Sequence, residues 1–243
     1  MVRDATSGPS TKTAQVAPPP GYPARHRSSA PGSAHPPRWE VGQTAARTRS
    51  PASALTGEGA HDFARTRGTL VVGLEDAARF EQVFTAERLY VRGTTAKGSV
   101  DWMHVDRAGV KAERILKAPG NDPEFLLRQM LMGVRYRRLA AKDVDGVSAT
   151  RYPGELTHAA LALGMSPEAR KKVDQMRDMT GGTIPATADV WLDRRGRLMR
   201  VRLQMDLEGM LLSTATLSPS GLGEPVQVRV PADAVEAETS SLV

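Results

Sequence analysis

The sequence contains no cysteine, which excludes disulfides, thiolate metal ligands and cysteine nucleophiles. Aromatic residues are scarce at 5%, and hydrophobic residues reach 40%, slightly low for a wholly globular chain. No segment approaches the ~20 consecutive apolar residues that a membrane-spanning helix needs. The formal net charge is +6, but many of the arginines are scattered among Pro, Ala, Gly and Ser near the N-terminus, so no nucleic-acid partner is expected.

The first 60 residues are depleted in the side chains that build a core. They contain no Phe or Ile, and Leu55 is their only leucine. Such a segment cannot bury enough apolar surface to offset the entropy cost of ordering its backbone. We therefore expect a disordered Pro/Arg/Ala-rich tail over 1–60, a folded domain over 63–236 and a disordered C-terminus over 237–243.

Alternating apolar and polar residues predict that the folded part is dominated by antiparallel strands. The clearest pattern is a hairpin over 188–207 with a turn at Arg195-Gly196. Asp145-Gly146 predicts a second tight turn, which leads into a strand over 147–152. Further strands are expected at 68–74, 80–84, 88–92, 102–105, 211–217 and 226–230, and the pattern over 110–117 fits either a strand or a helix.

Capping residues and apolar spacing predict three helices. Asp122 is expected to cap a helix with Pro123 at its first position, and Ser166 with Pro167 should open another that ends at Gly181. A third helix is expected over 155–163. The element order lacks strict strand–helix alternation, so we predict an α+β fold with a strongly curved antiparallel sheet and helices packed on one side of it.

No arrangement of residues typical of catalysis is found in the sequence. Phosphate-binding glycine loops, dinucleotide fingerprints and G-x-S-x-G elbows are missing. His104 and His158 lack a second histidine at zinc-site spacing. Asp189 and Asp193 could form an acid–base pair, but charge pairing with arginines across the hairpin is the favoured interpretation. We expect no catalytic residue, no metal and no cofactor.

Three segments resemble a known family. They are 144–152, which contains Asp145-Gly146, the stretch 184–193 with its Val190-Trp191 pair, and the closing 222–228. They are similar to the LppX/LprAFG-like lipoproteins of actinobacteria, in the form of Streptomyces-type sequences, over roughly 63–236. The resemblance implies a LolA-like fold, in which the curved sheet forms a half-barrel with helices packed on its concave face. An apolar cavity between sheet and helices would hold acyl chains of lipids or glycolipids.

The resemblance also implies a place at the cell envelope, where such proteins are anchored through a lipidated N-terminal cysteine. This sequence has neither that cysteine nor the apolar run of a signal peptide. We therefore expect either a misassigned start of the chain or a soluble, unanchored relative.

The leading hypothesis is a non-enzymatic carrier of lipids or lipidated molecules, with acyl chains and the membrane surface as partners and a monomeric state. Flexible methionines would suit an apolar ligand surface, although they fill ordinary cores equally well. The alternatives are a solid-cored interaction module with a basic tail, or an unrecognised enzyme. The expected cavity-lining residues are Leu126, Met130, Leu131, Leu156, Leu163, Met176, Val201 and Leu203.

Overall fold

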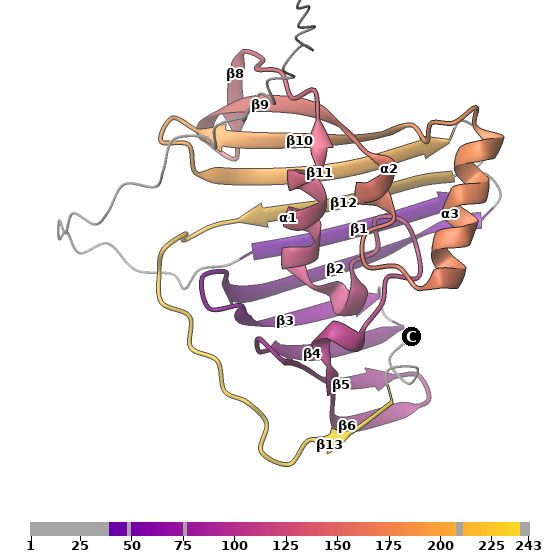
Figure 1. Ribbon diagram of the computed structural model, residues 1–243. Coiled ribbons are helices and arrows are strands. Elements are labelled where there is room, and N and C mark those ends of the chain that lie inside the picture. Colours follow the sequence, from indigo (N-terminus) through magenta and orange to yellow (C-terminus); the bar gives the residue numbers. More distant parts are fainter. Residues whose placement is uncertain (1–38, 48–49, 75–76, 208–210, 239–243) are drawn as a thin grey trace, which may run out of the picture. The chain divides into compact units, whose positions relative to one another are not determined.

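Thirteen strands of the described residues form one sheet (Figure 1). The structure, a computed structural model, describes residues 39–47, 50–74, 77–207 and 211–238. The strands are β1 (Trp39–Arg47), β2 (Ser50–Asp62), β3 (Arg67–Leu74), β4 (Ala78–Phe84), β5 (Arg88–Thr95), β6 (Gly98–Asp106), β7 (Gly133–Val134), β8 (Ala141–Val144), β9 (Val147–Leu156), β10 (Ala186–Asp193), β11 (Leu198–Leu207), β12 (Leu211–Pro219) and β13 (Val235–Glu236).

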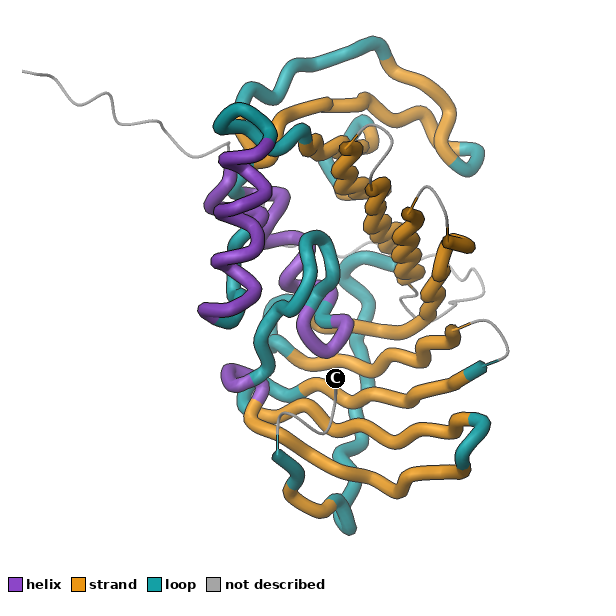
Figure 2. Tube along the Cα trace, turned by 90° about the vertical axis from the view of Figure 1, so that its right-hand side faces the viewer, coloured by secondary structure: helices purple, strands orange, loops and turns teal. Residues whose placement is uncertain are grey.

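The sheet follows the order β13-β6-β5-β4-β3-β2-β1-β12-β11-β10-β9-β7, and β8 also pairs with β9. Its pairs are antiparallel except for β13 beside β6. The sheet curls, and the helices lie on its concave side (Figure 2). The helical segments are η1 (Arg107–Gly109), η2 (Pro119–Asn121), α1 (Pro123–Leu131), α2 (His158–Leu161) and α3 (Pro167–Met179). The predicted α+β fold class is confirmed.

The predicted caps of α1 and α3 are confirmed. The Asp122 carboxylate accepts a hydrogen bond from the Glu124 backbone N–H at 2.9 Å. The Ser166 hydroxyl accepts one from the Ala169 N–H at 3.2 Å. Each interaction satisfies a backbone donor that the first helical turn leaves without an intrahelical partner.

The helix predicted over 155–163 is wrong at its start. Strand β9 continues to Leu156, because Gly154 and Glu155 pair with Ala188 and Thr187 of β10. Inter-strand hydrogen bonds therefore take up the backbone groups that a longer helix would need. The helix α2 begins only after Thr157, whose hydroxyl caps it.

The predicted boundary of the N-terminal tail is also corrected. Residues 39–47 and 50–62 form β1 and β2, which lie in the middle of the sheet. Strand β1 pairs with β12 on one side and with β2 on the other, so its backbone is hydrogen-bonded on both edges. This pairing does not depend on the large apolar side chains whose scarcity suggested disorder. The expectations for 1–38 and 239–243 lie outside the described residues.

The final strand predicted over 226–230 is wrong. Pro225 and Pro231 flank this segment, and neither can donate a backbone hydrogen bond to a neighbouring strand. The segment runs unpaired, and the chain adds the short β13 beside β6 instead. Residues 110–117 form neither a strand nor a helix, apart from a bridge between Ala112 and Met165. The predicted hairpins β8–β9 and β10–β11 are confirmed.

Candidate functional site: a pocket beside the apolar core

Among the described residues, buried apolar side chains of the sheet and of the helices form a cluster between the concave face of the sheet and the helices. The alternation of β11 places Val201, Leu203 and Met205 on this face, each at most 1% exposed. Other strands contribute Leu70, Val72, Phe84, Leu89 and Leu217, and the helices contribute Phe125, Leu126, Leu161 and Val173. Burial of this extent supplies the main driving force for packing the helices onto the sheet.

Seven of the eight expected ligand residues belong to or contact this cluster. Leu126, Leu156, Val201 and Leu203 are buried members. Met130, Leu163 and Met176 are partly buried and pack against it. The eighth expectation, Leu131, is wrong as an inward-facing residue. It is the last residue of α1, and 75% of it is exposed to solvent.

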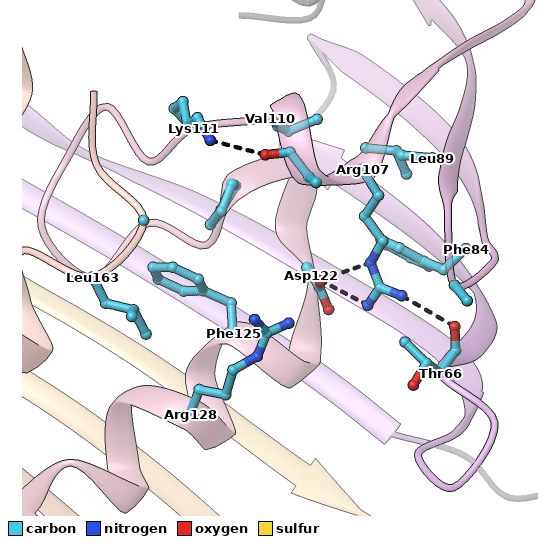
Figure 3. Close-up of a pocket in the computed structure, with 14 residues that line it drawn as sticks. Thr66, Phe84, Leu89, Arg107, Val110, Lys111, Asp122, Phe125, Arg128 and Leu163 are labelled. Atoms are coloured by element: carbon cyan, nitrogen blue, oxygen red, sulfur yellow. Dashed lines mark hydrogen bonds and ion pairs between the residues drawn. The ribbon is translucent and has the colours of Figure 1, made fainter. Parts of the chain in front are cut away.

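A pocket of about 320 Å³ opens beside the cluster, between the N-terminal end of α1, η1, η2 and the β4–β5 region (Figure 3). Its apolar wall includes Phe84, Leu89 and Phe125, which are also buried members of the cluster. The pocket therefore borders the core directly. The remaining lining residues are Thr66, Ala86, Arg107, Ala108, Val110, Lys111, Pro119, Asp122, Arg128, Leu163 and Gly164.

Sequence reasoning identified only Leu163 among these lining residues. Most of the others lie in turns and in the irregular segment 107–122, where no apolar period marks which side chains point inward. The one available signal was Asp122, whose capping position fixes where α1 begins. Its second role, as an ion-pair partner, depends on a residue 15 positions earlier in the chain.

Arg107 ties three segments together at the wall of the pocket. Its guanidinium donates to the Asp122 carboxylate at 2.7 and 3.0 Å. It also donates to the backbone oxygens of Thr66 and Thr85 at 3.0 and 2.9 Å. The side chains of Arg107 and Asp122 are each only 9% exposed. This network fixes the start of α1 against the β2–β3 and β4–β5 turns (Figure 3).

His61 and Glu124 lie beside this network. The His61 Nε2 is 3.6 Å from a Glu124 carboxylate oxygen, and the His61 side chain is completely buried. Burial lowers the pKa of His61 to about 4, so the imidazole is neutral near pH 7. Burial also raises the pKa of Glu124, against the opposing effect of Arg107. The Glu124 carboxylate also lies 3.3 Å from the Arg107 guanidinium.

The polar residues singled out in the sequence are held in ion pairs elsewhere. Asp189 accepts hydrogen bonds from Arg151 of β9 at 2.9 Å. Asp193 accepts one from Arg197 at 2.7 Å. Burial alone would raise the pKa of Asp193, but hydrogen bonds from the Arg197 and Arg195 segment outweigh burial and lower it. The charge-pair interpretation therefore fits both carboxylates, although their partners differ from the arginines directly across the hairpin.

In the described part of the chain, no three His, Asp or Glu side chains lie close enough together to hold a metal ion. His158 of α2 is 2.7 Å from Asp174 of α3, an ion-pair geometry that links the two helices. None of the helices in the described residues has both the length and the apolar character that crossing a bilayer requires.

Neither a family model nor a curated protein matches the sequence. Among solved structures, the fold is similar to LprF from Mycobacterium bovis, with 15% identity and a TM-score of 0.45 over 81% of this chain and 90% of that one. It is also similar to the lipoprotein LppX from Mycobacterium tuberculosis, with 14% identity and a TM-score of 0.39 over 79% and 89%. A third similar structure is that of a LolA superfamily protein from Nitrosomonas europaea, with 10% identity and a TM-score of 0.32 over 80% of this chain and 87% of that one.

Proposed function

We propose that this protein binds the apolar chain of a lipid or a lipidated molecule, without catalysing a reaction, and does so at the cell envelope. The observation that carries the proposal is the pocket whose walls, Phe84, Leu89 and Phe125, are also part of the apolar core. An apolar chain placed there leaves water, which favours binding by ~25 cal/mol per Å² before the costs of association.

The pocket volume sets a limit on the ligand that fits without rearrangement. A volume of about 320 Å³ is near the lower end of the ~300–1,000 Å³ typical of small-molecule sites. A long acyl chain therefore requires the helices and the segment 107–122 to shift away from the sheet. We expect the chain to extend from the pocket along the apolar cluster between the sheet and the helices.

The residues that border this space favour such a shift. Four partly buried methionines pack against the cluster from the helical side, namely Met130, Met132, Met165 and Met176. Unbranched thioether side chains change rotamer at low cost and fit irregular apolar shapes. Two of the covering helices are short, since α2 has four residues and α1 has nine. Short helices depend on packing rather than on their own stability.

A substitution that fills the pocket tests the proposal. Val110 lines the pocket from an irregular segment and is only partly buried, so Val110→Trp should occupy the space without disrupting the sheet. Val100→Trp is the matched control, because Val100 is 45% exposed on β6 and is not a lining residue. Titration with a fluorescent fatty-acid probe should show binding at least about tenfold weaker for Val110→Trp, which is the cost of losing ~1.4 kcal/mol.

The control should bind the probe as the unmodified protein does. Native mass spectrometry of the protein purified from its own host, without detergent, should show a bound species of lipid mass. Equal probe binding by both variants, or no uptake by any of them, would contradict the proposal.

A further inference from the structure

The two halves of the sheet differ in charge. The segments that hold β7 to β11, residues 133–156 and 186–207, contain ten Lys and Arg against six Asp and Glu. The described residues that hold β3 to β6, 67–74 and 77–106, contain five Lys and Arg against four Asp and Glu. The first group of strands therefore has four surplus positive charges, and the second has one. A field of this kind orients the protein toward an anionic partner.

Ion pairs do not use up the positive charge of the β7–β11 half. Four arginines pair with carboxylates: Arg135 with Glu155, Arg151 with Asp189, Arg197 with Asp193 and Arg200 with Asp145. Six further cations are exposed and have no carboxylate within ion-pair distance among the described residues. They are Arg137, Arg138, Lys142, Arg194, Arg195 and Arg202.

The β8–β9 turn and the β10–β11 turn lie at the same end of their strands. Lys142 of β8 pairs with Ala149 of β9, and Ala149 pairs with Asp193 of β10, at the β10–β11 turn. Neighbouring strands are ~4.8 Å apart, so Lys142 lies only two strand spacings from that turn. Arg200 also reaches Asp145 of the β8–β9 turn at 2.8 Å. We call these two turns, together with residues 131–142, the basic edge.

Exposed apolar side chains accompany the cations of the basic edge. Five of the twelve large apolar residues exposed in the described part of the chain lie between residues 131 and 147. They are Leu131 at 75%, Val134 at 41%, Tyr136 at 37%, Leu139 at 41% and Val147 at 40% exposure. Three of them alternate with Arg135, Arg137 and Arg138 along the chain.

The segment that bears these side chains is held in place. The Tyr136 hydroxyl donates to the Met130 carbonyl at 2.6 Å. The backbone N–H groups of Arg137 and Leu139 donate to the Pro153 and Arg151 carbonyls of β9 at 3.1 and 2.9 Å. The charges and apolar groups are thus presented on a segment that is hydrogen-bonded to β9 at the margin of the sheet, which lowers the entropy cost of binding.

We propose that the basic edge binds the anionic surface of a lipid bilayer. Lys and Arg side chains near such a surface are attracted by its phosphates, and neighbouring apolar and aromatic side chains enter the region between headgroups and acyl chains. A nucleic acid would account for the cations but not for the five exposed apolar residues. The proposal stands independently of the pocket, since none of its residues lines it.

Vesicle binding by the full chain tests this proposal with a matched pair of triple variants. Arg137→Gln, Arg138→Gln and Lys142→Gln remove three cations from the basic edge. Arg170→Gln, Lys171→Gln and Lys172→Gln remove three exposed cations from α3. Both variants lose the same net charge, and the rest of the chain contributes equally to each. Thermal unfolding should confirm that both remain folded.

The measurement is co-sedimentation with vesicles of phosphatidylcholine, with or without phosphatidylglycerol. The unmodified protein should bind the phosphatidylglycerol vesicles and should dissociate as salt is raised. The edge variant should bind at least about tenfold more weakly, and the α3 variant nearly as well as the unmodified protein. Leu139→Ser should weaken binding without changing its dependence on salt.

Other outcomes would overturn the proposal. Equal losses in the two triple variants would show a response to net charge alone. Binding to vesicles of phosphatidylcholine alone that is as strong as binding to vesicles with phosphatidylglycerol would show that the cations have no role. Tighter binding to duplex DNA than to phosphatidylglycerol vesicles, lost in the edge variant, would assign the edge to nucleic acid instead.

Discussion

Arg107 is the residue on which the geometry of the candidate site most depends. Its guanidinium contacts Asp122, Glu124 and two backbone carbonyls from separate turns, and it is almost completely buried. It also lies 5.5 Å above the Phe84 ring, a wall of the pocket. A single side chain thus holds the start of α1 against the sheet and shapes the pocket beside it.

Replacing Arg107 with Gln should lower the free energy of unfolding by ~3–5 kcal/mol, because it leaves the buried Asp122 carboxylate and the partly buried Glu124 carboxylate without their cation. The matched control is Arg135→Gln, whose pair with Glu155 is exposed at 75% and 53%. That change should cost no more than ~1 kcal/mol. Urea unfolding followed by circular dichroism measures both, and similar losses would show that the buried network has no special role.

His61 should make stability depend on pH. Its pKa is about 4 in the folded protein and 6.5 in the unfolded chain, so the unfolded chain binds more protons between these values. The His61 contribution is therefore complete above pH 6.5 and is lost as the pH falls toward 4. At ~1.4 kcal/mol for each pH unit, the full loss is about 3 kcal/mol.

The variant His61→Gln isolates this effect. Glu124 acts in the opposite direction, because its raised pKa makes the folded protein gain stability as its carboxyl is protonated. The difference in unfolding free energy between the variant and the unmodified protein removes the other titrating groups. Between pH 7 and pH 4, this difference in unfolding free energy should change by about 3 kcal/mol in favour of the variant. A difference that stays constant with pH would contradict the role of His61.

The strands and helices differ in how well the sequence predicts them. The alternation in β11 and the capping residues Asp122 and Ser166 are local, and the elements they predict are present. The strand β1 is different, because its partners come from β2 and from β12, far along the chain. No local sequence pattern indicates that Trp39 lies opposite Pro219. A segment of small residues is therefore predicted to be a disordered tail.

A proline in β1 tests that correction. Thr44 lies opposite Ala54 of β2 and Thr214 of β12, so β1 has a strand on both sides at this point. The variant Thr44→Pro removes a backbone donor from the middle of the sheet and should lower the free energy of unfolding by at least ~1–3 kcal/mol. Thermal unfolding measures the change, with Thr44→Ala as the control. No loss beyond that of the control would restore residues 39–60 to the tail.

At the scale of the whole molecule, the fold class could be predicted and the site could not. The order of strands and helices was sufficient to predict a curved sheet with helices on one face. The eight residues expected to contact a ligand were chosen from regular elements, and seven reach the core for that reason. Most of the residues that line the pocket lie in turns and irregular segments, which Arg107 and Asp122 join, so only contacts in three dimensions reveal it.

Photochemical labelling measures most directly where an apolar chain binds. A fatty acid with a diazirine on its chain is bound to the protein and irradiated, and the labelled peptides are identified by mass spectrometry. We predict adducts on the peptides that contain Phe84, Leu89, Val110 and Phe125, and much less labelling in the presence of excess unlabelled fatty acid. Adducts confined to exposed apolar residues such as Leu131 and Met179, or labelling that excess ligand does not reduce, would contradict the account.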